Sequence, residues 1–278
     1  MAIEPRDTWR ARLRSRACLR GKIALNGSAR RMIARSLFDP DRRVIMDFNA
    51  KAGCTVAVRM FLDHMGLLDE ALEYRKWIHH YRRDVFSARH PTTIEAFLSR
   101  RNVLFKVVRN PFPRVISALR NKVRTGKGIE KIVNSLKLER IEDITFRQFV
   151  RYLESIDLRE RCDSHYRHQS RKYEKLDLRR PFVCKVETLE ADVARLNERF
   201  GFAFNPANVT SSHHAKIDSD VDAFVADVPW REFGEALPGY RHFYDAGLAE
   251  QVAKLYRPDL EAYQYQFPWP EFGPTQQG

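Results

Sequence analysis

Residues 44–62 read VIMDFNAKAGCTVAVRMFL, and this pattern predicts a strand, a tight turn and a helix in immediate succession. Apolar residues fill most of positions 44–48, small residues follow Lys51, and apolar residues then recur at helical spacing. Such a turn gathers backbone N–H groups at the positive end of a helix dipole, which favours an anion beside Lys51. In an ATPase loop of the form GxxxxGK[ST] the lysine follows the second glycine. Lys51 instead precedes Gly53, which disfavours that class of protein.

Two further strand-to-helix transitions have the same form. Residues 103–108 (VLFKVV) predict a second strand, after which Asn110 is a suitable N-cap and Pro111 a suitable first helical residue. Residues 182–186 (FVCKV) predict a third strand, which leads into a helix that Gly201 terminates. The alternation predicts an α/β fold with a P-loop-like parallel β-sheet flanked by helices. Weaker helical patterns cover residues 70–77, 92–101 and 246–256, and Pro258 is expected to end or kink the last of these helices.

The composition indicates a soluble protein with a polyanionic partner. With 49 basic and 36 acidic residues the net charge is +13, which suits a nucleic acid, an acidic glycan, an anionic lipid or a multiply phosphorylated nucleotide. The four cysteines include no CxxC pair, which argues against a disulfide framework or a zinc site and favours a reducing compartment. No apolar run approaches the roughly 18 to 20 residues that cross a bilayer, and we expect a cytoplasmic protein.

The expected organisation is a basic N-terminal extension (1–43), one α/β domain (44–270) and a short tail (271–278). No acidic residue occurs between Thr8 and Phe38, whereas basic residues accumulate there, namely Arg10, Arg12, Arg14, Arg16, Arg20, Lys22, Arg30, Arg31 and Arg35. The extension is either an amphipathic arm that contacts an anionic membrane or another polyanion, or a solvated extension with no partner.

A second anion-binding pattern follows the second predicted strand. Residues 107–122 read VVRNPFPRVISALRNK, in which Arg109 stands at the strand end and Ser117 lies about two helical turns further on. Two anion sites on adjacent strand ends suit a nucleotide that is phosphorylated at both ends.

At these segments the chain resembles the sulfotransferases that use 3'-phosphoadenosine 5'-phosphosulfate (PAPS), most closely carbohydrate sulfotransferases of the chondroitin 4-O type (sulfotransferase family 2). Their signatures are Pro-Lys-x-Gly/Ala-Cys-Thr and Phe-Val-Arg-[Asp/Glu]-Pro-Phe-x-Arg-Leu-x-Ser-Ala. Weaker matches are DSHYRHQ at 163–169 and CKVETLEAD at 184–192, and the matches run in order from Val44 to about Phe267. The resemblance implies the sulfotransferase fold and transfer of a sulfuryl group from PAPS to a hydroxyl, with a carbohydrate acceptor expected.

The same resemblance implies a role for each matching residue. The 5'-phosphosulfate contacts are expected from Lys51, Ala52, Gly53, Cys54 and Thr55, with Arg59 nearby. The 3'-phosphate contacts are expected from Arg109 and Ser117, and acceptor contacts from His165, Arg167 and Gln169. A guanidinium forms two parallel hydrogen bonds to phosphate, and Lys51 with the loop N–H groups can neutralise growing negative charge without a metal.

Transfer to a hydroxyl also needs a general base, for which histidine is suited near neutral pH. His79 and His80 lie between the two donor motifs, where related sulfotransferases carry a catalytic histidine. Counting back from Arg109 favours His79, and in an extended segment its neighbour would point the opposite way. A cluster formed by His213, His214, Asp218, Asp220 and Asp222 is interpreted as a solvated loop rather than a metal site.

Two other classes of protein remain alternatives. A basic polyanion-binding or nucleic-acid-binding protein without catalysis explains the charge, but not two ordered anion motifs. A nucleotide kinase shares the fold class but requires a Walker lysine that the chain lacks. The leading hypothesis predicts PAPS and a hydroxyl acceptor as partners, no specific nucleic acid, and a bacterial or otherwise cytosolic setting, since the membrane anchor of Golgi members is missing.

Overall fold

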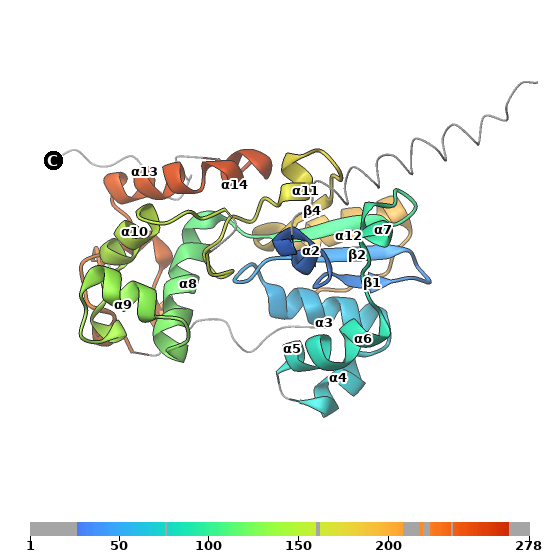
Figure 1. Ribbon diagram of the computed structural model, residues 1–278, viewed down its shortest axis with the longest axis horizontal. Coiled ribbons are helices and arrows are strands. Elements are labelled where there is room, and N and C mark those ends of the chain that lie inside the picture. The colour runs from blue at the N-terminus through green and yellow to red at the C-terminus, as the bar shows by residue number, and fades with distance from the viewer. Residues whose placement is uncertain are drawn as a thin grey trace, which may run out of the picture. The chain divides into compact units, whose positions relative to one another are not determined.

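The computed structural model describes residues 27–75, 77–159, 162–207, 217–218, 223–234 and 236–266, which are coloured along the chain in Figure 1. The chain divides into two compact units. The sheet unit consists of Met1–Phe48, Gly53–Val108 and Ser170–Thr210, and the helical unit consists of Asn49–Ala52, Arg109–Gln169 and Ser211–Gly278. The basic residues from Arg10 to Lys22 lie outside the described residues, and the expected domain boundaries after residues 43 and 270 stay predictions.

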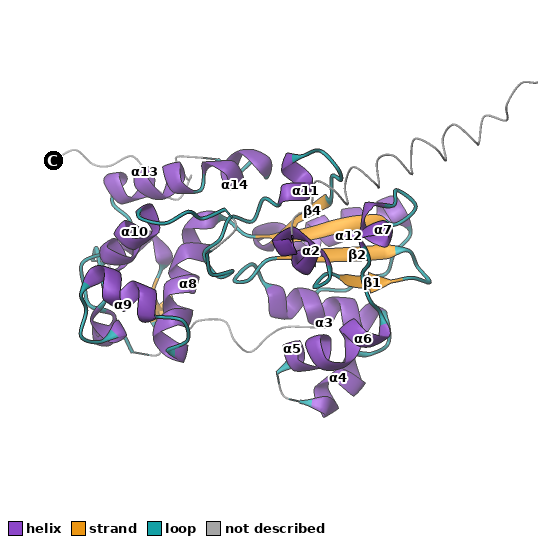
Figure 2. Cartoon of the chain, in the orientation of Figure 1, coloured by secondary structure: helices purple, strands orange, loops and turns teal. Residues whose placement is uncertain are grey.

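The sheet unit is built on a four-stranded sheet, drawn as arrows in Figure 2. The strand order is β1 (Leu37–Asp39), β2 (Val44–Phe48), β3 (Val103–Val108) and β4 (Phe182–Lys185). Strands β2, β3 and β4 are parallel, whereas β1 pairs antiparallel with β2. The predicted α/β fold with a parallel sheet is therefore confirmed. β1 is an edge strand that the sequence pattern did not predict, and β4 ends one residue before the predicted boundary.

Helices pack on both faces of this sheet, because alternate strand residues point to opposite sides. On one face Met46 and Phe105 share a core with α3 (Cys54–His64) and α12 (Leu189–Phe200). On the other face Ile45 and Leu104 share a core with α2 (Gly27–Ile33), α7 (Ile94–Leu98) and α11 (Lys172–Lys175).

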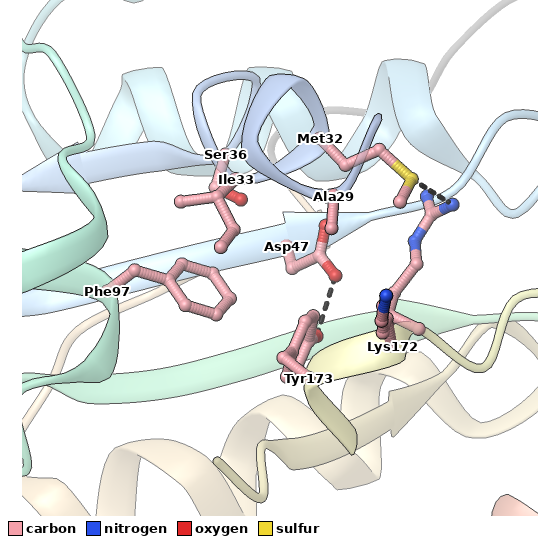
Figure 3. A pocket seen from close by; sticks show the side chains of 9 residues that line it. Ala29, Met32, Ile33, Ser36, Asp47, Phe97, Lys172 and Tyr173 are labelled. Atoms are coloured by element: carbon pink, nitrogen blue, oxygen red, sulfur yellow. Dashed lines mark hydrogen bonds between the residues drawn. The ribbon is translucent and has the colours of Figure 1, made fainter. Parts of the chain in front are cut away.

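Lys106 carries a fully buried charge on the second of these faces. Its Nζ lies 2.5 Å from Glu174 Oε2 and 3.5 Å from Asp47 Oδ2. The Tyr173 hydroxyl donates to the same Asp47 oxygen at 2.7 Å, as Figure 3 shows. The cavity beside Asp47 and Tyr173 has a volume of about 10 Å³, which holds at most one water molecule and is too small for a nucleotide.

The segment around His79 and His80 corrects one prediction, since it is helical rather than extended. It forms α5 (Ile78–Tyr81), which continues into a π-helical turn, η1 (Arg82–Phe86). Helical spacing here buries Ile78, Tyr81 and Phe86. Consecutive side chains in a helix diverge by about 100°, so the two histidines do not point in opposite directions. The other elements of the sheet unit are α4 (Leu68–Tyr74), α6 (Ser87–Arg89) and η3 (Val186–Thr188).

The longest described helix of the helical unit begins at the predicted residue. Helix α8 (Pro111–Thr125) has Pro111 at its start, and the Asn110 side chain accepts a hydrogen bond from the Phe112 N–H at 3.1 Å. The helix predicted near the C-terminus is α13 (Ala246–Leu255), and Pro258 lies in the first turn of α14 (Arg257–Ala262). The remaining elements are α9 (Glu130–Leu136), η2 (Ile141–Asp143), α10 (Phe146–Glu154), β5 (Ile217–Asp218), η5 (Trp230–Glu232), β6 (Leu237–Pro238) and η6 (Tyr240–Phe243).

Aromatic side chains form much of the core of the helical unit. Phe146 of α10 packs edge-to-face against Phe243 and Tyr244, with ring centroids 5.6 and 5.0 Å apart. The buried Tyr244 hydroxyl donates to the Phe112 carbonyl at 2.9 Å, which fixes the start of α8. The first turn of α8, which begins two residues after Arg109, therefore rests on a packed core.

Three of the four cysteines, Cys54, Cys162 and Cys184, are free thiols, and Cys18 lies outside the described residues. Among the helices that the structure describes, none combines the length and the apolar character that crossing a membrane requires.

Candidate functional site

The N-terminus of α3 in the sheet unit requires glycine at its cap. Gly53 has φ of 63°, in the left-handed region that favours glycine. A Cβ atom at this position would lie 3.0 Å from Val186 Cγ2, so Gly53 also allows close packing. The first N–H groups of an α-helix, here those of Cys54 and Thr55, have no acceptor within the helix and lie at its positive end. This helix start suits an anion, and the half-buried Arg59 follows in its second turn.

The helical unit holds the preceding segment, Asn49–Ala52, next to Arg109. Lys51 has φ of 64°, which is uncommon for a residue with a side chain. The Ala52 N–H donates to the Asn49 carbonyl at 3.2 Å, which closes the turn. The Arg109 Nη1 donates to the Lys51 carbonyl oxygen at 3.3 Å. The lysine of the first anion motif and the arginine of the second are therefore neighbours within one unit.

A second arginine, Arg114, joins this turn to the segment that carries His165. The residue is 1% exposed, and its Nε donates to the Ala50 carbonyl at 3.1 Å. Its Nη2 reaches the Ser164 carbonyl at 3.4 Å. One buried cation therefore holds three segments of the helical unit together: the turn, α8 and the chain before His165.

Gln169, predicted to contact the acceptor, is fully buried and bonded to the backbone of Arg109. Its Oε1 accepts from the Arg109 N–H at 2.9 Å, and its Nε2 donates to the Arg109 carbonyl at 2.7 Å. The backbone N–H of Gln169 donates to both carboxylate oxygens of the buried Asp259, at 2.9 and 2.8 Å. These contacts fix the position of Arg109. A role for Gln169 in acceptor binding stays a prediction, as does phosphate binding by Ser117, which lies half-buried in α8.

His165 forms a short hydrogen-bonded pair with Asp163. The His165 Nδ1 lies 2.6 Å from Asp163 Oδ1, and the Lys122 Nζ lies 2.5 Å from the other carboxylate oxygen. Burial alone would raise the pKa of Asp163, but the hydrogen bonds from His165 and Lys122 hold it well below its usual range. Arg167 donates to the Cys162 carbonyl. This arrangement fixes the imidazole and engages Nδ1, so that Nε2 is the nitrogen that remains for a ligand.

His79 in the sheet unit is a neutral, enclosed imidazole. Its ring lies 5.2 Å from that of Trp77 and 6.3 Å from that of Phe48, the last residue of β2. Burial, with smaller effects from the charges of Arg82 and His80, lowers its pKa to about 4. Its Nε2 is buried and has no hydrogen-bond partner among the described residues, and the same is true of His80 Nδ1. A neutral nitrogen of this kind can accept a proton from a bound hydroxyl.

Three further residues at these contacts, Arg82, Arg114 and Asp259, were not predicted from the sequence. Arg82 lies one helical turn after His79, and its guanidinium is 5.4 Å from the Phe48 ring centroid. Burial lowers its pKa, and the Arg35 charge lowers it further. Helical spacing from His79 could have indicated Arg82, and the second anion motif (residues 107–122) contains Arg114. No local signal marks Asp259, which lies 90 residues from its partner.

The described residues contain no group of three or more His, Cys, Asp or Glu side chains that could hold a metal ion. The cluster considered above is not tested, because His213, His214, Asp220 and Asp222 lie outside the described residues. In the helical unit the cationic donors Lys51 and Arg109 suit a phosphate-bearing ligand, and in the sheet unit the start of α3 does so as well.

One of three comparisons with known proteins found a match for this chain. Searches of the curated proteins and of the solved structures gave no match. A family model described as the sulfotransferase family matches residues 35–266, which include all four strands of the sheet and both anion motifs. The chain therefore belongs to the sulfotransferase family, whose members are enzymes that transfer a sulfuryl group from PAPS.

Proposed function

We propose that this enzyme transfers the sulfuryl group of PAPS to a hydroxyl of a carbohydrate. The observation that carries the proposal is the hydrogen bond from the Arg109 guanidinium to the Lys51 carbonyl, which brings the arginine of the second anion motif to the backbone of the first. The similarity of both motifs to carbohydrate sulfotransferases supports the acceptor class. Family membership favours an enzyme over the non-catalytic polyanion binder and over the nucleotide kinase.

The proposed donor contacts divide into two sets. Lys51, Ala52, Gly53, Cys54 and Thr55, with Arg59, bind the 5'-phosphosulfate, and Arg109 and Ser117 bind the 3'-phosphate. PAPS supplies the sulfuryl group and a doubly phosphorylated adenosine as the leaving group. Lys51 and the N–H groups at the start of α3 neutralise the negative charge that grows on the leaving phosphate. Gln169 holds the backbone of Arg109 in place through two hydrogen bonds.

We assign the general base to His79, with His80 as the alternative. The lowered pKa of His79 keeps its imidazole neutral at pH 7, so Nε2 can take the proton of the acceptor hydroxyl. Negative charge brought by the donor favours the imidazolium form and so strengthens the base. His165, fixed by Asp163, and Arg167 are proposed acceptor contacts, because an imidazole and a guanidinium suit hydroxyl and carboxylate groups of a sugar.

The test is transfer of radiolabelled sulfuryl groups from PAPS to a panel of glycans, a tyrosine peptide and a simple phenol. We expect labelled glycan, and we expect Lys51→Ala and Arg109→Ala each to lower kcat/KM by about a hundredfold or more. Arg124→Ala, which removes an exposed arginine from the last turn of α8, is the matched control and should retain activity. Labelling of the phenol or peptide but of no glycan would contradict the acceptor class. Normal turnover by the Lys51 or Arg109 variant would contradict the assigned donor contacts.

A further inference from the structure

A cavity of about 530 Å³ opens in the sheet unit, at the edge of the sheet where β3 and β4 begin. Val103 and Phe182, the first residues of these two parallel strands, line it. The six residues of β3 separate this edge by about 17 Å from the edge that leads to Arg109. The cavity is therefore distinct from the proposed donor contacts, which follow the other ends of the strands.

Four arginines, namely Arg100, Arg179, Arg180 and Arg199, line this arginine cavity together with one acidic residue, Asp177. Arg180 is paired with Asp177, with Nε 2.7 Å from Oδ1. Within the described part of the chain, neither Arg100 nor Arg199 has a carboxylate partner. The cavity therefore carries an excess of three positive charges, and both Arg100 and Arg199 are exposed to solvent.

Arg179 shows that the positive charge is held in place rather than dispersed. Its guanidinium donates to the Ser99 carbonyl at 2.6 Å and also to the Asn102 carbonyl. Burial, followed by the charge of Arg100, lowers the pKa of Arg179. Two like charges near one another, with one fixed by backbone carbonyls, are stabilised when an anion enters between them.

Aromatic rings form the apolar part of the same cavity. Phe182 and Phe200 pack edge-to-face with centroids 6.0 Å apart, and Phe200 is 36% exposed. The Arg199 guanidinium lies 5.3 Å from the centroid of the Phe200 ring. An exposed ring beside guanidinium groups suits a ligand that has both an apolar face and negative charge, such as an acidic sugar.

Single-stranded nucleic acid also combines stacking faces with negative charge, but it is bound on grooves in which successive bases stack on aromatic side chains. Of the two phenylalanines in this cavity only Phe200 is exposed, and its position at the C-terminus of α12 offers one stacking surface rather than a row. A sulfotransferase acting on glycans also has a polyanionic product, for which a fixed cluster of guanidinium groups is suitable.

We propose that the arginine cavity binds a sulfated or carboxylated segment of a glycan chain, an inference that rests on the carbohydrate acceptor proposed above. Arg100, Arg179 and Arg199 contact the acidic groups, and Phe200 packs on a sugar ring. Since this edge of the sheet lies away from the donor contacts, the cavity retains a glycan chain while another part of the chain reacts.

The test measures binding of a fluorescein-labelled, fully sulfated hexasaccharide by fluorescence anisotropy. An excess of 3',5'-diphosphoadenosine keeps the donor site filled. We expect Arg100→Ser/Arg199→Ser to weaken binding by at least about tenfold. The control Arg75→Ser/Arg140→Ser removes the same charge from two exposed arginines outside the cavity and should leave binding nearly unchanged. Phe200→Ala should weaken the hexasaccharide complex without changing the charge.

Equal losses in the two double variants, or wild-type binding by Arg100→Ser/Arg199→Ser, would overturn the inference. A labelled hexathymidylate that binds as tightly as the hexasaccharide, and is lost in the same variant, would assign the cavity to nucleic acid and also overturn it. The acceptor proposal is judged separately by the transfer assay. If Arg100→Ser/Arg199→Ser loses hexasaccharide binding, the control double variant keeps it, and no glycan is sulfated, the cavity inference holds and the acceptor proposal fails. If glycans are sulfated and the cavity variant binds normally, only the cavity inference fails.

Discussion

Replacing Gly53 with alanine perturbs the start of α3 in two separable ways. Its φ of 63° disfavours any residue with a side chain, and the new Cβ would lie 3.0 Å from Val186 Cγ2. Gly66 is a matched control, because its φ is 70° but no heavy atom beyond its own residue and its two chain neighbours lies within 4 Å of the Cβ position. The two substitutions share the backbone strain and the change in unfolded-chain entropy, and differ in the contact with Val186.

The expected magnitudes follow from these two terms. Gly66→Ala should lower the free energy of unfolding by about 1 kcal/mol, which is the cost of the left-handed conformation. Gly53→Ala should lower it by about 2 to 3 kcal/mol, because overpacking against Val186 adds to that cost. Val186→Ala in the Gly53→Ala background should recover about 1 kcal/mol relative to its effect in the wild type, as a double-mutant cycle measures.

The assay is urea unfolding followed by circular dichroism, combined with titration of 3',5'-diphosphoadenosine. Gly53→Ala should weaken nucleotide binding by about tenfold, since one hydrogen bond to a charged group is worth about that factor. Gly66→Ala should bind the nucleotide like the wild type. Equal destabilisation by the two substitutions, or no coupling between Gly53 and Val186, would refute the role of close packing at this turn.

Three further outcomes are expected. Because the pKa of His79 is lowered to about 4, the unfolded chain binds a proton there between pH 6.5 and 4 while the folded chain does not, so stability falls as the pH is lowered through that window. His79→Gln should flatten this fall in urea unfolding and lower kcat by about a hundredfold or more, whereas an unchanged pH profile would argue against the burial of His79. Gln169→Leu should cost about 2 to 3 kcal/mol of stability, because it removes the two buried hydrogen bonds between Gln169 and the Arg109 backbone. It should also raise the KM for PAPS more than that for the acceptor, and an unchanged donor KM would contradict positioning of Arg109. Lys106→Met should cost about 3 to 5 kcal/mol in urea unfolding, because the Glu174 carboxylate loses its buried cation, and a loss below about 1 kcal/mol would contradict this.

Much of the sheet unit could be predicted from local patterns. The strands at 44–48 and 103–108 are buried, β-forming runs. Asn110 starts α8 through a local hydrogen bond, and Gly201 ends α12 through its left-handed backbone conformation. β1 could not be predicted in this way, because its three residues form no apolar run and its turn to β2 contains Arg43 rather than glycine at positive φ.

The helix at His79 was missed because four residues carry too little periodicity to distinguish a helix from an extended segment. Its apolar spacing continues only through the π-helical turn, where the regular period changes. Contacts between residues far apart in the chain could not be predicted from local sequence patterns either. Arg114 and Gln169 are polar and would be expected at the surface, but their partners Ala50 and Asp259, 64 and 90 residues away in the chain, allow them to be buried.

The anion motifs themselves were recognisable because each combines a strand end, a helix start and a cation within a few residues. What the sequence could not give is their distance from one another. The hydrogen bond from Arg109 to the Lys51 carbonyl supplies that distance within the helical unit.

The most direct measurement of the central claim, that Lys51 and Arg109 bind opposite ends of one nucleotide, is thermal stabilisation by 3',5'-diphosphoadenosine, 5'-AMP and ATP. The wild type should be stabilised most by the doubly phosphorylated adenosine. Arg109→Ala should respond to it no more than to 5'-AMP, while Lys51→Ala should bind both more weakly by a similar factor. Equal stabilisation of the wild type by all three nucleotides, or an unchanged preference in Arg109→Ala, would contradict the account.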